Sequence, residues 1–269
     1  MSKLRILYVA SEVDPFLAVT PVADFIRKLP SAMKTKGFDI RILVPRFGLI
    51  NERKNRLHEV VRLSGFTVPV GDADMPVTIK VASLPLATLQ VYFIDNEDYF
   101  QRKYVFTDKE GEFYADNDER AIFFCKGALE TVKKLGWSPD IVHCTDWMSA
   151  LIPLYLKTTY KDDVIFKDSK SVFSVFDNEF AHKFQFEGLY DKIKLPNIED
   201  DMLSALSTAD YNGFIKIGIE YADMIIIPTE VATEKFNTII DVSPDKKFEY
   251  VSETNTEGFY DLYTALAGA

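Results

Sequence analysis

The sequence is poor in the side chains that metal sites and disulfide frameworks require. It has two cysteines and three histidines in 269 residues, and two isolated cysteines are too few for either kind of site. We therefore expect Cys125 and Cys144 to be buried, reduced thiols, and we expect no bound metal and no cofactor. The signatures of dinucleotide-binding, zinc-protease and serine-hydrolase sites (Gly-x-Gly-x-x-Gly, His-Glu-x-x-His and Gly-x-Ser-x-Gly) are also missing.

Long apolar runs and an excess of positive charge are absent as well. No apolar run reaches the roughly 18 residues that suggest a membrane span. The apolar residues 4–10 pass directly into Ser11 and Glu12, without the pattern of a secretion signal. The formal net charge of −10 disfavours nucleic acids, anionic membranes and polyanions as partners. We therefore expect a cytoplasmic protein whose ligands are not polyanionic.

The most informative absence lies in the first loop. Residues 4–10 read as a buried strand and 22–36 as a helix, and a nucleotide-binding enzyme would place glycines and a cation between them. Here the loop 16–21 reads FLAVTP. A phosphate-binding turn needs free backbone N–H groups and close approach of the anion, but Pro21 has no N–H. The sequence therefore predicts the frame of a nucleotide site without its phosphate contact.

Strand-type and helical segments alternate along the chain, which predicts an α/β fold with a doubly wound parallel sheet. The expected strands are 4–10, 39–45, 86–95, 140–144, 171–176 and 224–228, and the expected helices are 22–36, 117–135, 147–160, 204–222 and 229–237. Residues 56–70 and 75–84 alternate apolar and polar, which predicts an inserted antiparallel hairpin with its turn at 71–74. The polar tail 239–269 is either disordered or docked, and docking through Phe259, Tyr260, Leu262 and Leu266 is favoured.

Four parts of the sequence, in order, carry a resemblance to a known family. They are ILYVASEVDPF with the following VADFIRKLPSAMKTKGFDIRILVPRFG, then YADNDERAIFFCKGALE, SPDIVHCTDWMSALIPLYLK and YNGFIKIGIEYADMIIIPTEVATEKF. Together they resemble the amino-terminal catalytic domain of bacterial glycogen synthases and plant starch synthases. The resemblance implies the amino-terminal half of a GT-B glycosyltransferase, over residues 1–238. Such enzymes move glucose from ADP-glucose onto the 4-OH of an α-1,4-glucan. We expect no carboxyl-terminal nucleotide-binding domain in this chain.

The resemblance also shows where the sequence departs from the family pattern. The family's Lys-Thr-Gly-Gly loop, whose Lys contacts the phosphates, is replaced by Ala18, Val19, Thr20 and Pro21. Two further active-site motifs have lost histidines. In the His-Ala-His-Asp-Trp-His motif Thr145 and Met148 stand for the second and third His, and Phe176 replaces a His that lies beside the reacting sugar.

Other family positions are kept, and the resemblance makes them candidate substrate-binding residues. They are Glu12, Asn117, His143 and Asp146. Two of them also have a structural interpretation: Asp146 stands where it would cap a helix beginning near Trp147, and Asn117 opens a predicted helix. His182 either reaches the space that the family's histidine would fill at the position of Phe176, or lies in a surface loop. His58 is expected to be exposed. No residue is assigned a catalytic role.

These departures favour a protein that is catalytically inactive alone and acts as a glucan- or partner-binding module. The alternative is the catalytic subunit of a split glycogen synthase, completed by a separate nucleotide-binding chain. A third hypothesis is a diverged enzyme that uses another sugar nucleotide. The expected ligands are an α-glucan or ADP-glucose. A protein partner or a second copy is expected on the face that a second domain would cover, and that face should then carry apolar residues.

Overall fold

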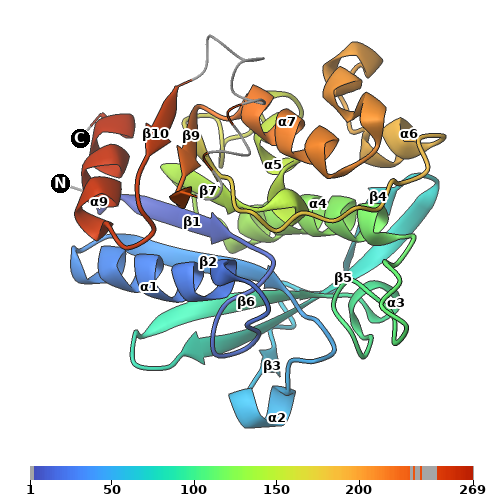
Figure 1. Cartoon of the computed structure of the whole chain (residues 1–269). Coiled ribbons are helices and arrows are strands. Elements are labelled where there is room, and N and C mark those ends of the chain that lie inside the picture. The colour runs from blue at the N-terminus through green and yellow to red at the C-terminus, as the bar shows by residue number, and fades with distance from the viewer. Residues whose placement is uncertain (1–2, 231–232, 234–236, 238–246, 269) are drawn as a thin grey trace.

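The computed structural model describes residues 3–230, 233, 237 and 247–268. In this part of the chain ten strands form one sheet, in the order β10-β9-β8-β7-β1-β2-β6-β5-β3, with β4 paired to β5 (Figure 1). The strands are β1 (Arg5–Val9), β2 (Asp39–Pro45), β3 (His58–Glu59), β4 (Phe66–Val70), β5 (Ala73–Leu84), β6 (Leu89–Asp95), β7 (Ile141–Thr145), β8 (Lys170–Ser174), β9 (Met224–Ile227) and β10 (Phe248–Tyr250).

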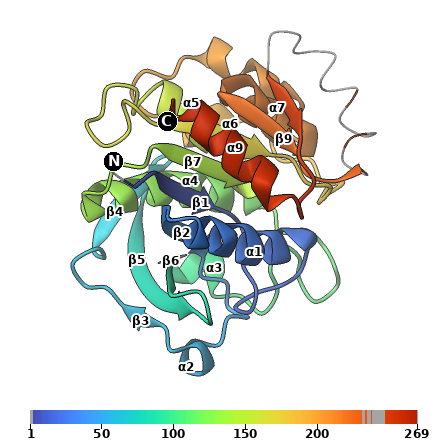
Figure 2. The ribbon, with the colours of Figure 1, turned by 90° about the vertical axis from the view of Figure 1, so that its left-hand side faces the viewer.

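Helices cover both faces of the sheet. They are α1 (Pro21–Thr35), α2 (Glu52–Asn55), α3 (Glu97–Phe100), α4 (Asn117–Leu135), α5 (Ile152–Lys157), α6 (Leu189–Ile193), α7 (Tyr211–Tyr221) and α9 (Thr256–Leu266), with 3-10 helices η1 (Trp147–Ser149) and η2 (Asp200–Thr208). Helices α1 and α9 pack together on one face and α4 lies on the other, where α5 contacts both α4 and α7 (Figure 2). This arrangement buries the parallel strands on both sides, as their continuous apolar sequences require.

The predicted fold class is confirmed. Strands β6, β2, β1, β7, β8, β9 and β10 pair in parallel, whereas β5 runs antiparallel to β6, β3 and β4. The inserted hairpin turns between Val70 and Ala73, where Gly71 adopts a positive φ of 58° that glycine tolerates without strain. The predicted strand 39–45 and helix 117–135 coincide with β2 and α4.

Two predicted helices are wrong because each is broken in two. The predicted helix 147–160 is the short η1 followed by α5, and Pro153 stands in the first turn of α5, where its missing N–H costs nothing. The predicted helix 204–222 is η2 followed by α7. Between them Ala209 has a φ of 47°, and the Asp210 carboxylate starts the new helix by accepting from the Gly213 N–H. Apolar spacing continues across both breaks, which is why the pattern predicted single helices.

The tail is described over residues 247–268, where β10 extends the sheet and α9 covers it. Phe259 and Tyr263 are fully buried, and Tyr260 stacks on Phe38 at a ring distance of 5.4 Å. Residues 238–246, with the predicted domain boundary, lie outside the described residues, as does most of the predicted helix 229–237. The described tail is therefore part of the folded body.

The interior is one continuous apolar core. Cys125 and Cys144 lie within it as free thiols, which confirms the expectation for both. None of the helices in the described part of the chain combines the length and the apolar character that crossing a bilayer requires.

Candidate functional site

The carboxyl ends of β1, β7 and β8 meet at one edge of the sheet. Strand β1 is the point where the winding reverses, since β2 and β7 flank it on opposite sides. Open α/β sheets bind ligands at such a point, outside the carboxyl ends of the strands. Asp146 follows β7 directly, Phe176 lies two residues after β8, and Glu12 lies three residues after β1. We call these residues, with the loop 16–21, the strand-end site.

The Glu12 side chain is bonded to the loop that would bind phosphate in a nucleotide site. Its carboxylate accepts from the Val19 N–H (2.5 Å), the Thr20 N–H (2.8 Å) and the Thr20 hydroxyl. The Thr20 oxygen in turn accepts from the Val22 N–H and caps α1, which begins at Pro21. Burial raises the pKa of Glu12, and these hydrogen bonds oppose the rise. The carboxylate thus occupies the loop N–H groups that an anionic ligand would need.

Asp146 is fully buried and joins β1 to β7. Its carboxylate accepts from the Ser11 hydroxyl (2.6 Å), the Ser11 N–H (3.3 Å) and the Met148 N–H (2.8 Å). The last bond caps η1, so the helix-cap role is present. Burial raises the pKa of Asp146 to about 7, against the hydrogen bonds from Ser11 and Met148. Ser11, which the sequence analysis did not single out, is therefore the main partner of this carboxylate.

His143 lies within β7, apart from the strand-end site, and faces α1 and α9. Its Nδ1 lies 2.5 Å from the Tyr263 hydroxyl and its Nε2 lies 2.6 Å from the Ser174 hydroxyl. Complete burial lowers the pKa of His143 to about 3, which makes the imidazole neutral. Both ring nitrogens are already bonded within the protein. Tyr263 was missed in the sequence, although its spacing of four from Phe259 places both on one helix face.

Asn117 supports the loop before α4. Its amide donates to the Phe106 carbonyl (2.8 Å) and accepts from Arg120, whose guanidinium also donates to the Val105 carbonyl (2.7 Å). Arg120 is fully buried, and burial lowers its pKa to about 10. These contacts hold the loop 101–116 against the start of α4.

The three side chains that stand where the resemblance implies histidines face the interior. Thr145 and Met148 are fully buried, and Phe176 is 2% exposed with its ring 5.1 Å from that of Phe25. The Phe176 carbonyl accepts from the Tyr211 hydroxyl (2.8 Å). None of these three side chains offers a charged group to a ligand at the strand-end site.

Aromatic rings from two loops cover the end of β7. The Phe113 ring lies 4.6 Å from that of Phe180, which packs 4.9 Å from Trp147. His182 is half-buried and rests against Phe113 at 5.2 Å. We call this group, with Phe106 and Phe184, the aromatic lid. His58 is exposed on the hairpin, far along the sheet from it.

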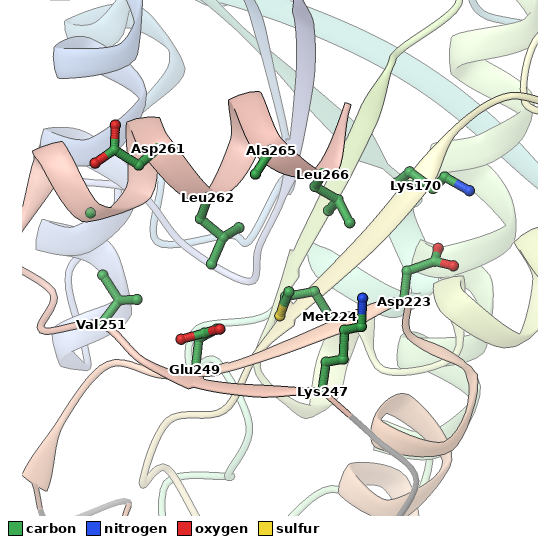
Figure 3. A pocket seen from close by; sticks show the side chains of 11 residues that line it. Lys170, Asp223, Met224, Lys247, Glu249, Val251, Asp261, Leu262, Ala265 and Leu266 are labelled. Atoms are coloured by element: carbon green, nitrogen blue, oxygen red, sulfur yellow. The ribbon is translucent and has the colours of Figure 1, made fainter. Parts of the chain in front are cut away.

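Three cavities are described, and none of them is lined by Glu12, His143 or Asp146. The largest, of about 680 Å³, lies between α9 and the β9–β10 edge (Figure 3). There Leu262 and Leu266 point from α9 toward Met224, the first residue of β9, so this cavity opens at the amino ends of the strands. Within the described residues no group of three or more His, Cys, Asp or Glu could hold a metal ion.

Comparisons with known proteins identify the family of this chain. A family model described as starch synthase catalytic domain matches residues 5–233. The glycogen synthase of Pelodictyon phaeoclathratiforme is 38% identical over 234 residues, which are 86% of this chain and 47% of that protein. The glycogen synthase of Chlorobium limicola is 40% identical over 224 residues, 82% of this chain and 45% of that protein. This chain thus spans about half the length of the curated relatives it matches.

A solved structure shows the same fold. The catalytic domain of starch synthase IV from Arabidopsis thaliana, bound to ADP and acarbose, superposes with a TM-score of 0.74 over 96% of this chain and 53% of that chain, at 18% identity. The sheet with its covering helices has the fold of the amino-terminal half of a GT-B glycosyltransferase. The chain belongs to the starch synthase catalytic domain family, which its glycogen synthase relatives share.

Proposed function

We propose that this chain is a member of the family that has lost glucosyl transfer and binds α-glucan. One observation carries the proposal: the loop that would face a diphosphate has no cation at residues 18–21, and the Glu12 carboxylate holds its Val19 and Thr20 N–H groups. A second anion at this loop would be repelled by the carboxylate. Glucosyl transfer needs the opposite, a cation that stabilises the departing diphosphate, and residues 18–21 supply none.

The other family-matched residues are also hydrogen-bonded within the protein. Asp146 is hydrogen-bonded to Ser11 and Met148. His143 is hydrogen-bonded to Tyr263 and Ser174. Asn117 is hydrogen-bonded to Phe106 and Arg120. A buried polar group that leaves such partners for a ligand pays the cost of breaking them. In this structure these hydrogen bonds stabilise the domain.

Glucan binding is the function that remains compatible with the surface. The acidic chain disfavours polyanions and not neutral sugars, and the related Arabidopsis domain was solved with acarbose as well as ADP. The aromatic lid places several rings beside the strand-end site. Aromatic rings with a few polar groups are typical linings of small-molecule sites.

The test measures binding and transfer separately. The purified chain should sediment with glycogen and be released by maltoheptaose, while radiolabelled ADP-glucose should give no incorporation above a protein-free control. Failure to sediment with glycogen would refute the binding role. Incorporation that depends on the chain alone would refute the loss of transfer.

The split-enzyme alternative needs a second polypeptide. It is tested by adding the carboxyl-terminal half of the Chlorobium limicola glycogen synthase to the same transfer assay. We expect no incorporation in the mixture, because the loop 18–21 still lacks its cation. Incorporation that requires both polypeptides would establish the alternative.

A second candidate function, partner binding, is favoured by exposed apolar side chains at the strand-end edge. Val19, Leu49 and Tyr104 are exposed by 58%, 51% and 44%. Val19 and Leu49 lie in the loops that follow β1 and β2, and Tyr104 lies in the segment between α3 and α4. Such side chains match the apolar face expected of an interface. Sedimentation velocity at two concentrations, with a Leu49→Ser variant as comparison, would detect self-association through this face.

A further inference from the structure

A second cavity lies at the carboxyl ends of β9 and β10, beyond the strand-end site. Its volume is about 390 Å³, within the range of small-molecule sites. Its lining includes Thr229 and Glu230, which follow β9, and Tyr250, Ser252, Glu253 and Thr254, at and after the end of β10. None of these positions belongs to the motifs on which the strand-end site was predicted.

The two sides of this cavity are held together by the backbone. The Glu253 N–H donates to the Pro228 carbonyl at 3.0 Å, which joins the segment after β10 to the segment after β9. On the β10 side the Ser252 and Thr254 hydroxyls lie 3.1 Å apart and hydrogen-bond to each other. The polar groups are therefore presented from a connected framework.

The chemistry of the lining selects for a neutral, hydroxyl-rich ligand. Glu230 and Glu253 bring carboxylates, and the described lining residues include no Lys or Arg. Arg and Lys form the strongest hydrogen bonds to phosphates and carboxylates, so a lining without them disfavours an anionic ligand. Two carboxylates without a third ligand do not make a metal site in the described residues either. Carboxylate and hydroxyl oxygens are, however, good partners for the hydroxyl donors of a sugar.

Tyr250 adds a flat apolar surface at the rim. Tyr250 ends the edge strand β10 and is 58% exposed. An exposed ring beside clustered oxygens suits a ligand that has an apolar ring face and a polar edge. The larger cavity beneath α9 differs, since Lys170 and Lys247 belong to its lining (Figure 3).

We propose that this cavity is a subsite for a neutral α-glucan, in which the Tyr250 ring packs against one sugar ring while Glu230 and Glu253 accept hydrogen bonds from its hydroxyls. The inference rests on the proposed function, because it names the place where the glucan binds. It goes further than the proposed function because it places the glucan contact at the ends of β9 and β10. None of the candidate residues Glu12, Asn117, His143 and Asp146 lines this cavity.

Titration calorimetry of the full chain with maltoheptaose tests the subsite. Tyr250→Ala should weaken binding about three- to tenfold, the effect of losing one ring contact, and Glu253→Gln should weaken it in the same direction. Tyr250→Phe keeps the ring and should bind nearly as well as the wild type. Lys170→Gln, in the other cavity, is the matched control and should leave the affinity unchanged. Thermal unfolding of each variant checks that the fold is intact, since these substitutions should change stability little.

The outcomes separate the two proposals. If the wild type does not bind maltoheptaose, the proposed function and the subsite both fail. If the wild type binds and Tyr250→Ala and Glu253→Gln bind equally well, the subsite is overturned and the proposed function stands. A separate titration with ADP should show no binding that depends on Tyr250. Loss of ADP affinity in Tyr250→Ala would assign the cavity to a nucleotide and overturn the inference.

Discussion

The Nδ1 atom of His143 lies 2.5 Å from the hydroxyl of Tyr263, a residue 120 positions further along the chain. The Tyr263 hydroxyl also accepts from Tyr8 (3.2 Å), and the other imidazole nitrogen bonds Ser174. A neutral imidazole fits this series of hydrogen bonds when Tyr263 donates to Nδ1 and Nε2–H donates to Ser174. The network fastens α9 to three central strands, β1, β7 and β8.

Removing the Tyr263 hydroxyl should weaken this attachment. Tyr263→Phe leaves His143 Nδ1 buried without a partner, and we expect the free energy of unfolding to fall by about 1–3 kcal/mol. Tyr260→Phe is the matched control on the same helix, because among the described residues its hydroxyl makes no hydrogen bond. It should change stability by less than about 0.5 kcal/mol. Urea unfolding measures both, and equal effects would argue against the network.

The pH dependence of stability should report the burial of His143. Its pKa falls from 6.5 to about 3 on folding, so between these values only the unfolded chain binds the proton. The contribution of His143 is therefore complete above pH 6.5 and is lost as the pH falls toward 3, by up to about 1.4 kcal/mol per unit. Asp146 acts in the opposite direction, since its pKa rises from 3.8 to about 7 and its stabilising effect is lost as pH rises through 7.

A variant isolates the histidine from this opposing carboxylate. His143→Gln cannot titrate, so the stability advantage of the wild type over it should shrink as the pH is lowered from 6.5 to 4.5. His58→Gln makes the same substitution at an exposed site and serves as the control. Parallel curves for the wild type and His143→Gln would show that His143 is not buried in its neutral form.

Glu12 should control the mobility of the loop 16–21. Glu12→Ala removes the acceptor of the Val19 and Thr20 N–H groups, so hydrogen exchange at these two amides should accelerate by about tenfold, the equivalent of about 1.4 kcal/mol. Glu59→Ala removes an exposed carboxylate on β3 and should leave both rates unchanged. Unchanged exchange in Glu12→Ala would mean that the carboxylate does not order the loop.

Much of the fold could be predicted because it depends on local patterns. Residues 39–45 and 117–135 show the strand and helix periods clearly, and the structure confirms both. The breaks at Ala209 and before Pro153 were not predicted, because apolar spacing continues through them while the backbone turns. Such turns depend on capping side chains such as Asp210, which accepts a hydrogen bond at the start of α7. The spacing of apolar residues in the sequence does not show this capping.

The candidate site residues came from the resemblance, and their contacts could not be predicted from the sequence. The structure places Glu12 and Asp146 after the neighbouring strands β1 and β7. The sequence also predicted a loop without a phosphate contact, but not that the Glu12 carboxylate would take up its N–H groups. Likewise nothing local pairs His143 with Tyr263, since that contact depends on where the last helix docks.

Lys126 gives the strongest prediction for stability. The side chain is 1% exposed, and its ammonium donates to the carbonyls of Pro69 (2.8 Å), Lys192 (2.7 Å) and Lys194 (3.3 Å). Lys126→Met leaves these carbonyls without their donor, which should cost about 2–4 kcal/mol. Lys134→Met makes the same change on the exposed side of α4 and should cost less than about 0.5 kcal/mol. Because two of the carbonyls belong to Lys192 and Lys194, hydrogen exchange of residues 192–194 should accelerate in Lys126→Met and not in Lys134→Met. Equal stability of the two variants would show that hydrophobic packing of the residue 126 side chain outweighs its hydrogen bonds.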